Sequence, residues 1–295
     1  MNRPLLSQAS RPLTFDIDAI NELGEVVPTA IAGEHPLTLY VDKREIVTLM
    51  TLGAAPEALT LGYLRNQRLI SSLDEIIAVQ VDWEVSAVAV TTRHGNGIAA
   101  ARTAKRTVTT GCGQGTVFGD LMDEIDDIHL PASATLSETT LYGLLDAVRH
   151  HESIYKQAGA VHGCALAVGP EILMFVEDVG RHNAVDAIAG KMWLDGLEGG
   201  DKIFYTTGRL TSEMVIKTAQ MGIPFLVSRS GLTHCSSLAC SSPGSIGLAI
   251  WSFMPASRQV SRSPVMALAV IATIGSSAIP GSWRMARVAN SPSST

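Results

Sequence analysis

The second half of the chain repeats one pattern three times: a short apolar run ends in a polar loop that contains a glycine and an arginine. These loops are Glu177–Asp186, Thr206–Lys217 and Val227–Gly231. Residues 183–194 and 211–221, which begin within the first two loops, have apolar side chains at helical spacing. Strands that alternate with such helices predict a layered α/β sheet, with ligands bound beyond the strand ends.

The side chains of these loops are suited to an anion. Arginine binds phosphate through charge-assisted hydrogen bonds, and a helix N-terminus offers free backbone N–H groups. One such loop alone is an ordinary helix start, but three in succession predict a pocket for a phosphate- or pyrophosphate-bearing ligand. The candidate binding residues are Arg181, His182, Asn183, Arg209, Ser212 and Arg229. None of the loops is a Walker A loop, and no Gly-x-Gly-x-x-Gly opens a helix.

Composition narrows the class of protein. Hydrophobic residues make up 46% of the 295 residues and charged residues 17%, which is typical of a globular protein. The net charge of −6 offers no general basic surface for nucleic acid. The longest apolar stretch, Val265–Ile274, is about half the length that crosses a bilayer, and no signal peptide is recognisable. With four scattered cysteines, we expect a cytoplasmic protein with reduced thiols.

The first hundred residues predict a smaller α+β unit. Residues 37–41 alternate as a half-buried strand does, and Pro56 opens an amphipathic helix. Two strand-like runs, 76–81 and 85–91, are close enough to form a hairpin. In the second unit, Ser137 is a predicted helix N-cap, and a further hairpin precedes the first polar loop.

The chain therefore divides into three predicted parts. Residues 1–110 form a small α+β domain with a connecting segment, residues 111–234 form the α/β domain, and residues 235–295 form an atypical tail. All 28 acidic residues lie at or before Glu213, and the tail has no sustained helical or strand period. Two interpretations stay open, an ordinary flexible tail or a shifted reading frame in the gene. We expect residues from about Cys235 onward not to pack as a native element.

Two cysteines differ in their predicted surroundings. Cys112 lies between glycines in the polar loop Thr109–Thr116, with basic residues nearby that favour the reactive thiolate. Cys164 falls within a predicted buried strand, where we expect an inert core thiol. His162-Gly-Cys164 is similar to the His-x-Glu of zinc deaminases, but cysteine replaces the glutamate and no Pro-Cys-x-x-Cys follows. We therefore expect no catalytic metal.

Three segments, read together, resemble one family. Glu177–Asp186, Thr207–Val215 and Pro224–Ser230 resemble the FdhD/NarQ family of formate dehydrogenase accessory sulfurtransferases. The likeness runs in order from about Asp16 to Gly231. It implies a cytidine-deaminase-like layered α/β domain with a smaller α+β domain.

The resemblance also implies a function. Such a sulfurtransferase takes sulfur as a cysteine persulfide from a cysteine desulfurase. It passes the sulfur to the bis-molybdopterin guanine dinucleotide form of the molybdenum cofactor, which serves formate dehydrogenase. Cys112 matches the first cysteine of the family's Cys-x-x-Cys loop and is the implied catalytic residue, while the arginine loops hold the cofactor as bound acceptor. The implied partners are the desulfurase, formate dehydrogenase as client and, because the family is commonly dimeric, a second copy of the chain.

Two departures from the family keep other interpretations open. Gly115 occupies the place of the second cysteine, and beyond about His234 the family's helix, strand and basic cofactor-binding segment are not recognisable. A non-catalytic chaperone that binds and delivers the molybdenum cofactor is therefore an alternative. A metal-dependent hydrolase of the deaminase fold is a third interpretation.

Overall fold

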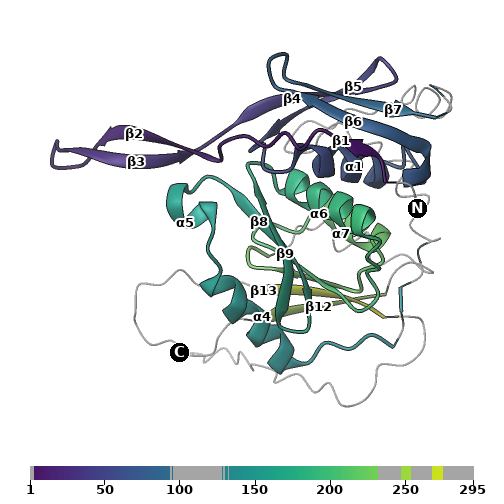
Figure 1. Cartoon of the computed structure of the whole chain (residues 1–295). Helices are drawn as coiled ribbons and strands as arrows, with labels where there is room; N and C mark the ends of the chain where they lie inside the picture. The colour runs from purple at the N-terminus through teal and green to yellow at the C-terminus, as the bar shows by residue number, and fades with distance from the viewer. Residues whose placement is uncertain are drawn as a thin grey trace, which may run out of the picture.

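The computed structural model describes residues 3–93, 95, 128, 130, 131 and 133–231, together with the backbone of two later strands, 247–253 and 268–274. The described chain is a mixed α/β protein with two large sheets and a two-stranded hairpin, stacked as an upper and a lower part (Figure 1). No helix in these residues is long and apolar enough to span a bilayer.

The upper part is built on a five-stranded sheet in the order β1-β6-β7-β4-β5. Its strands are β1 (Leu5–Leu6), β4 (His35–Val41), β5 (Arg44–Thr51), β6 (Ile76–Asp82) and β7 (Ala87–Thr92). Alternate residues of β4 are buried in one core with helix α1 (Pro56–Asn66). The predicted strands and the helix from Pro56 are confirmed. Strand β5 was not predicted; it forms a hairpin with β4 through Asp42 and Lys43, which both have positive φ.

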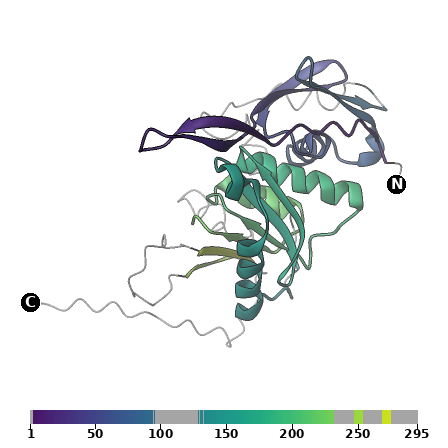
Figure 2. The same cartoon turned by 60° about the vertical axis from the view of Figure 1, so that its left-hand side comes forward.

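A second hairpin, also not predicted, projects from the body of the molecule (Figures 1 and 2). Its strands are β2 (Thr14–Ile20) and β3 (Val26–Ala32). Phe15, Ile17 and Ile31 share one face and are each more than 40% exposed, while Asp16 and Asp18 lie on the other face. The hairpin therefore contributes little to the hydrophobic core.

The lower part contains a six-stranded sheet in the order β12-β13-β11-β10-β8-β9. The four strands predicted from the sequence are β8 (His162–Val168), β9 (Glu171–Asp178), β10 (Ile203–Thr206) and β11 (Phe225–Ser228). Strands β8 and β9 form the expected hairpin, and β10 pairs antiparallel with β8. Strands β10 and β11 run parallel, which requires a crossover, and helix α7 (Ser212–Gln220) supplies it.

Helices cover both faces of this sheet, which confirms the predicted layered α/β arrangement. They are α4 (Glu138–His150) on one face and α6 (Arg181–Asp195) and α7 on the other, whereas the short helix α5 (Ile154–Ala158) has no buried residue and contacts β3. Neighbouring residues of β10 show the layers: Phe204 is buried in the core with α6 and α7, whereas Tyr205 is buried with Leu144 of α4. The predicted N-cap of α4 is present, because Ser137 Oγ accepts a hydrogen bond from Thr140 N.

Two strands beyond residue 234 also join this sheet, within the part of the chain for which the sequence predicted no native element. Strand β13 (Leu268–Ile274) pairs antiparallel with β11, and β12 (Gly247–Phe253) pairs antiparallel with β13. Both runs are rich in residues that favour strands, and a lack of acidic residues does not prevent backbone pairing. A shifted reading frame remains an interpretation of the tail's composition.

Helices α1 and α6 cross closely and join the upper part to the lower part. A Cβ atom on Gly62 would overlap the carbonyl oxygen of Asp186, and one on Gly190 would overlap that of Ala58. Only glycine allows the backbones to approach so far. The hydrophobic core therefore continues from the upper sheet through both helices into the lower sheet. The predicted domain boundaries near residues 110 and 234 lie outside the described residues and stay predictions.

Candidate functional site

Four strands meet at one edge of the lower sheet. Strands β10 and β11 run parallel and both end there. Strand β8, antiparallel to β10, begins there, and β9, antiparallel to β8, ends there. Because the three predicted loops follow β9, β10 and β11, the sheet brings them together at this edge. It is the place where α/β sheets bind their ligands.

Hydrogen bonds hold these loops in position. Gly163 N donates to Thr207 Oγ1 (3.0 Å), and Thr207 N donates in return to the Gly163 carbonyl oxygen (2.9 Å). Ser228 Oγ donates to the carbonyl oxygen of Gly208 (2.7 Å), and Ser230 Oγ donates to that of Thr207 (2.6 Å). Side chains on the loops are therefore presented from a fixed backbone.

One arginine from each loop lies near His162, the first residue of β8. Arg181 is 8% exposed, Arg229 is half-buried and Arg209 is exposed. Burial lowers the pKa of His162, and the positive charges of Arg181, Arg209 and Arg229 lower it further. Three cations beside one imidazole attract an anion and repel a metal cation.

Arg181 has an unsatisfied donor. Its aliphatic stem packs on Gly208, because a Cβ atom added to Gly208 would lie only 2.9 Å from Arg181 Cδ. Its Nε is buried and has no hydrogen-bond partner among the described residues. A buried N–H without an acceptor is costly, and an anion bound beside it would satisfy it.

The two helix N-termini at the site lack side-chain caps. Gly180, the N-cap residue of α6, has no side chain to cap the helix, and the side chain of Thr211, the N-cap residue of α7, accepts no hydrogen bond from its helix. The first N–H groups of a helix have no partner within the helix, so they favour an anion. Ser212, the first residue of α7, is 9% exposed at this position.

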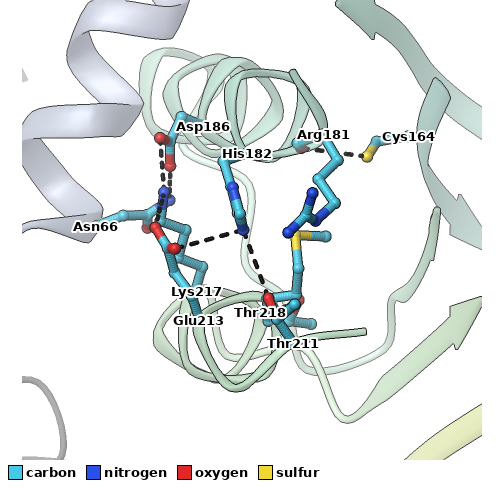
Figure 3. A network of polar contacts seen from close by, with 10 residues as sticks. Asn66, Cys164, Arg181, His182, Asp186, Thr211, Glu213, Lys217 and Thr218 are labelled. Atoms are coloured by element: carbon cyan, nitrogen blue, oxygen red, sulfur yellow. Dashed lines mark hydrogen bonds and ion pairs between the residues drawn. The ribbon is translucent and has the colours of Figure 1, made fainter. Parts of the chain in front are cut away.

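The side chain of His182 points toward α7 (Figure 3). Its Nε2 lies 3.4 Å from Glu213 Oε2 and 3.5 Å from Thr211 Oγ1. The imidazole is 3% exposed. His182 therefore links the first turns of α6 and α7. It is the neighbour of Arg181, whose Nε has no partner among the described residues.

The same contacts continue into a buried charged network (Figure 3). Lys217 Nζ lies 3.2 Å from Glu213 Oε1 and 2.8 Å from Asp186 Oδ2, and Asn66 Nδ2 donates to Asp186 Oδ1 (2.7 Å). Burial acts to lower the pKa of Lys217, but the carboxylates of Asp186 and Glu213 outweigh it, so the pKa is raised. Lys217 is therefore a buried cation that fixes α7 against α6 and, through Asn66, against α1.

Asn183 is turned into the protein interior. Its Nδ2 donates to the carbonyl oxygen of Met50 (2.6 Å) and to Asp178 Oδ1 (2.7 Å), and the residue is fully buried. Asp178 Oδ2 in turn accepts hydrogen bonds from Thr51 and from Leu52 N (3.1 Å). These bonds tie the first polar loop to β5 of the upper sheet.

The structure thus sorts five of the six predicted binding residues into two groups, and the sixth, Ser212, begins α7. Arg181, Arg209 and Arg229 gather near His162, whereas His182 and Asn183 make contacts that hold α6 in place. Sequence reasoning considered His162 only as part of a deaminase-like metal motif. The signal that could have found it is its place at the start of a strand antiparallel to β10, which brings it to the edge where the arginine loops lie.

The predicted carrier, Cys112, lies outside the described residues. Cys164 is fully buried in β8, as expected, and burial raises its pKa to about 12. Its Sγ lies 3.4 Å from Thr206 Oγ1. Within the described part of the chain, no group of three or more His, Cys, Asp or Glu side chains is arranged to hold a metal ion.

Known proteins are similar to this chain in sequence. A family model described as the FdhD/NarQ family matches residues 32–254. "Sulfur carrier protein FdhD" of Listeria monocytogenes serotype 4b (strain F2365) is 29% identical over 210 residues, covering 70% of this chain and 80% of the relative. The protein of the same name from Bacillus subtilis (strain 168) is 28% identical over 215 residues, covering 72% and 82% of the two chains.

A crystal structure from Desulfotalea psychrophila, of a protein assigned as a formate dehydrogenase accessory protein, is similar in fold. The TM-score is 0.62 at 27% identity, covering 77% of this chain and 89% of that one. The family match continues to residue 254, which corrects the expectation that the likeness ends near residue 234. Because the family model matches most of the chain, as the sequence motifs predicted, this protein belongs to the FdhD/NarQ family.

Proposed function

We propose that this protein is an accessory sulfurtransferase in which Cys112 carries sulfur as a persulfide. The donor is a cysteine desulfurase, and the acceptor is the molybdenum cofactor in its bis-molybdopterin guanine dinucleotide form. Formate dehydrogenase is the client that needs the cofactor. Family membership and the names of the relatives support this proposal.

The observation that carries the proposal is the arginine cluster at the sheet edge. Arg181, Arg209 and Arg229 come from three loops and act on one imidazole, and the Nε of Arg181 is buried without a partner in the described chain. The guanine dinucleotide groups of the acceptor carry phosphates, which match this set of donors in charge and geometry. The residues present therefore fit the proposed acceptor as a bound substrate.

Cysteine burial supports the choice of Cys112. A carrier cysteine must reach the persulfide of a partner protein and react as a thiolate. Cys164 can do neither, because it is fully buried and its pKa is raised to about 12. Cys112, Cys235 and Cys240 remain, and Cys112 alone has the family's loop position between glycines.

The loading step is an exchange between sulfurs. The Cys112 thiolate attacks the outer sulfur of the desulfurase persulfide, a new S–S bond forms on Cys112, and the desulfurase cysteine leaves as a thiolate. The number of persulfides is unchanged, so no external oxidant or reductant is needed. Gly111 and Gly113 give the loop backbone the freedom that attack and later delivery require.

The test is to incubate the full chain with a cysteine desulfurase and labelled cysteine and to locate persulfide by mass spectrometry. We expect label on Cys112, its loss in Cys112→Ala, and its retention in the matched control Cys240→Ala. Label that persists in Cys112→Ala would contradict the carrier role. If Cys112→Ala also still supported formate dehydrogenase in cells lacking their own factor, the chain would be a non-catalytic chaperone for the cofactor.

The proposal also covers the cellular location of the protein, its need for a metal and its oligomeric state. A cytoplasmic location supplies both the desulfurase and the apo-dehydrogenase, and the protein needs no catalytic metal of its own for sulfur exchange. A homodimer is part of the proposal by family resemblance. Size-exclusion chromatography with light scattering tests it directly, since the monomer has a mass of 31.2 kDa.

A further inference from the structure

His162 lies among the binding arginines, yet the proposed sulfur chemistry does not use it. It is the first residue of β8, opposite Asp178 at the end of β9. The two hydrogen bonds between Gly163 and Thr207 place it beside the loop of Arg209. Its side chain is only half-buried, so a ligand at the sheet edge can reach it.

The charges that face His162 are mainly positive. Arg181 comes from α6, Arg209 from the loop before α7, and Arg229 from the loop after β11. Arg229 also lies over the ring of Tyr155 in α5, with its Cζ 5.6 Å from the ring centroid. Each cation disfavours a proton on the imidazole.

The nearby acidic groups are engaged elsewhere. The carboxylate of Asp178 accepts hydrogen bonds from Gly180 N, Asn183, Thr51 and Leu52 N. The carboxylate of Glu177 accepts from the first backbone N–H groups of α5. On β8 and β10, burial raises the pKa of Cys164 and that of Tyr205, so both stay uncharged near neutral pH. No free anion among the described residues balances the three arginines around His162.

We infer that His162 is a proton-accepting member of the anion site, neutral in the free protein and protonated when a phosphate-bearing ligand binds. In the bound state, the imidazolium becomes a further hydrogen-bond donor to the ligand. The proton comes from a buffer acid in solution: an N–H bond forms on the imidazole, the bond between the acid and that proton breaks, and no other bond changes. The inference rests on the proposed function, because it assigns a role within the same phosphate site.

The physical reason is that a bound anion reverses the sign of the charge that acts on the imidazole of His162. In the free protein, burial and the three arginines lower the pKa of His162. An anion with two or more negative charges, placed between the arginines and the imidazole, favours the charged form of the imidazole. Ligand binding and proton uptake are therefore linked, and affinity increases as the pH falls through the range between the two pKa values.

The test follows the C2–H signal of His162 by NMR in the full chain, assigned by its loss in His162→Gln. The pH titration is run without ligand, with guanosine diphosphate, and with sulfate, which keeps two negative charges across this range. We expect a pKa below the ordinary histidine value in the free protein and a rise of roughly one pH unit or more with either ligand. Calorimetry should show sulfate affinity falling up to about tenfold per pH unit in that range, a dependence lost in His162→Gln.

His150 is the matched control, because its side chain is 73% exposed and lies at the end of α4. His150→Gln should bind both ligands as the unmodified protein does. If both ligands bind while the pKa of His162 stays constant, the inference is wrong and the phosphate site stands. If neither ligand binds, the phosphate-binding part of the proposed function fails, and the inference fails with it.

Discussion

Lys217 Nζ lies 2.8 Å from Asp186 Oδ2, and both side chains are buried between α6 and α7, 1% and 0% exposed. The pair belongs to the network that reaches His182, the neighbour of Arg181, through Glu213. The helix that begins at one arginine loop is thereby fixed to the helix that begins at another. The buried charged network therefore helps to fix the spacing of the two loops.

Removing the cation from this network should destabilise the fold. Lys217→Met leaves Asp186 buried without its cationic partner and removes one of the partners of Glu213, at a cost of about 3–5 kcal/mol in the free energy of unfolding. Urea denaturation measures this cost, and Lys217→Met combined with Asp186→Asn is the control, since it removes one of the stranded charges. We expect the double variant to recover part of the lost stability; a double variant less stable than the single one would contradict this account.

The loss in Lys217→Met should depend on pH. Burial raises the pKa of Asp186 above its ordinary value, and Lys217 opposes this effect. Without Lys217 the pKa rises further, so the deficit is fully present above the variant's folded pKa and shrinks as the pH falls through it. Urea unfolding at a series of pH values should show the two proteins converging toward acidic pH. A deficit that is constant with pH would contradict this account.

The close crossing of α1 and α6 predicts a severe effect at Gly62. A Cβ there overlaps backbone rather than a flexible side chain, so Gly62→Ala must push the helices apart. We expect a loss on the order of 3 kcal/mol or more, measured by thermal or urea unfolding. Thr139→Ala on the exposed side of α4 is the control and should change stability by less than about 0.5 kcal/mol. Equal effects of the two substitutions would show that the crossing tolerates a methyl group.

The arginine cluster predicts loss of nucleotide affinity. Arg181→Ala and Arg209→Ala each remove charge-assisted hydrogen bonds to phosphate, at a cost of about 1.5–3 kcal/mol. Calorimetric titration with guanosine diphosphate should show affinity reduced roughly ten- to over a hundredfold. Arg149→Ala, on an exposed position of α4, should bind normally. Unchanged affinity in both site variants would contradict the assignment.

The pairing of β13 between β11 and β12 predicts protection of its backbone. Residues 268–274 have neighbours on both sides of the strand, so their amides should exchange slowly with deuterated solvent. Hydrogen exchange with peptide-level mass spectrometry measures this, with residues of the projecting hairpin, such as Leu23, as a rapidly exchanging reference. Exchange at 268–274 as fast as at the hairpin tip would restore the expectation of a tail that does not pack.

The sequence by itself determined the local elements and the family. Apolar spacing located α1, α4, α6, α7 and the strands from β8 to β11, because amphipathic periodicity depends only on which residues face a core. It also placed Cys164 in a buried strand and identified the three arginine loops. It missed the hairpin β2–β3, whose alternating apolar side chains remain exposed, and β5.

The tertiary structure alone decided in which direction each loop side chain points. Arg181, His182 and Asn183 are consecutive in sequence, but successive helical residues point in directions about 100° apart. One therefore lies near His162, one pairs with Glu213 on α7, and one bonds to Met50 in the upper sheet. His162 joins the arginines only because β8 runs antiparallel to β10, and strand pairing between distant segments leaves no mark in local residue patterns.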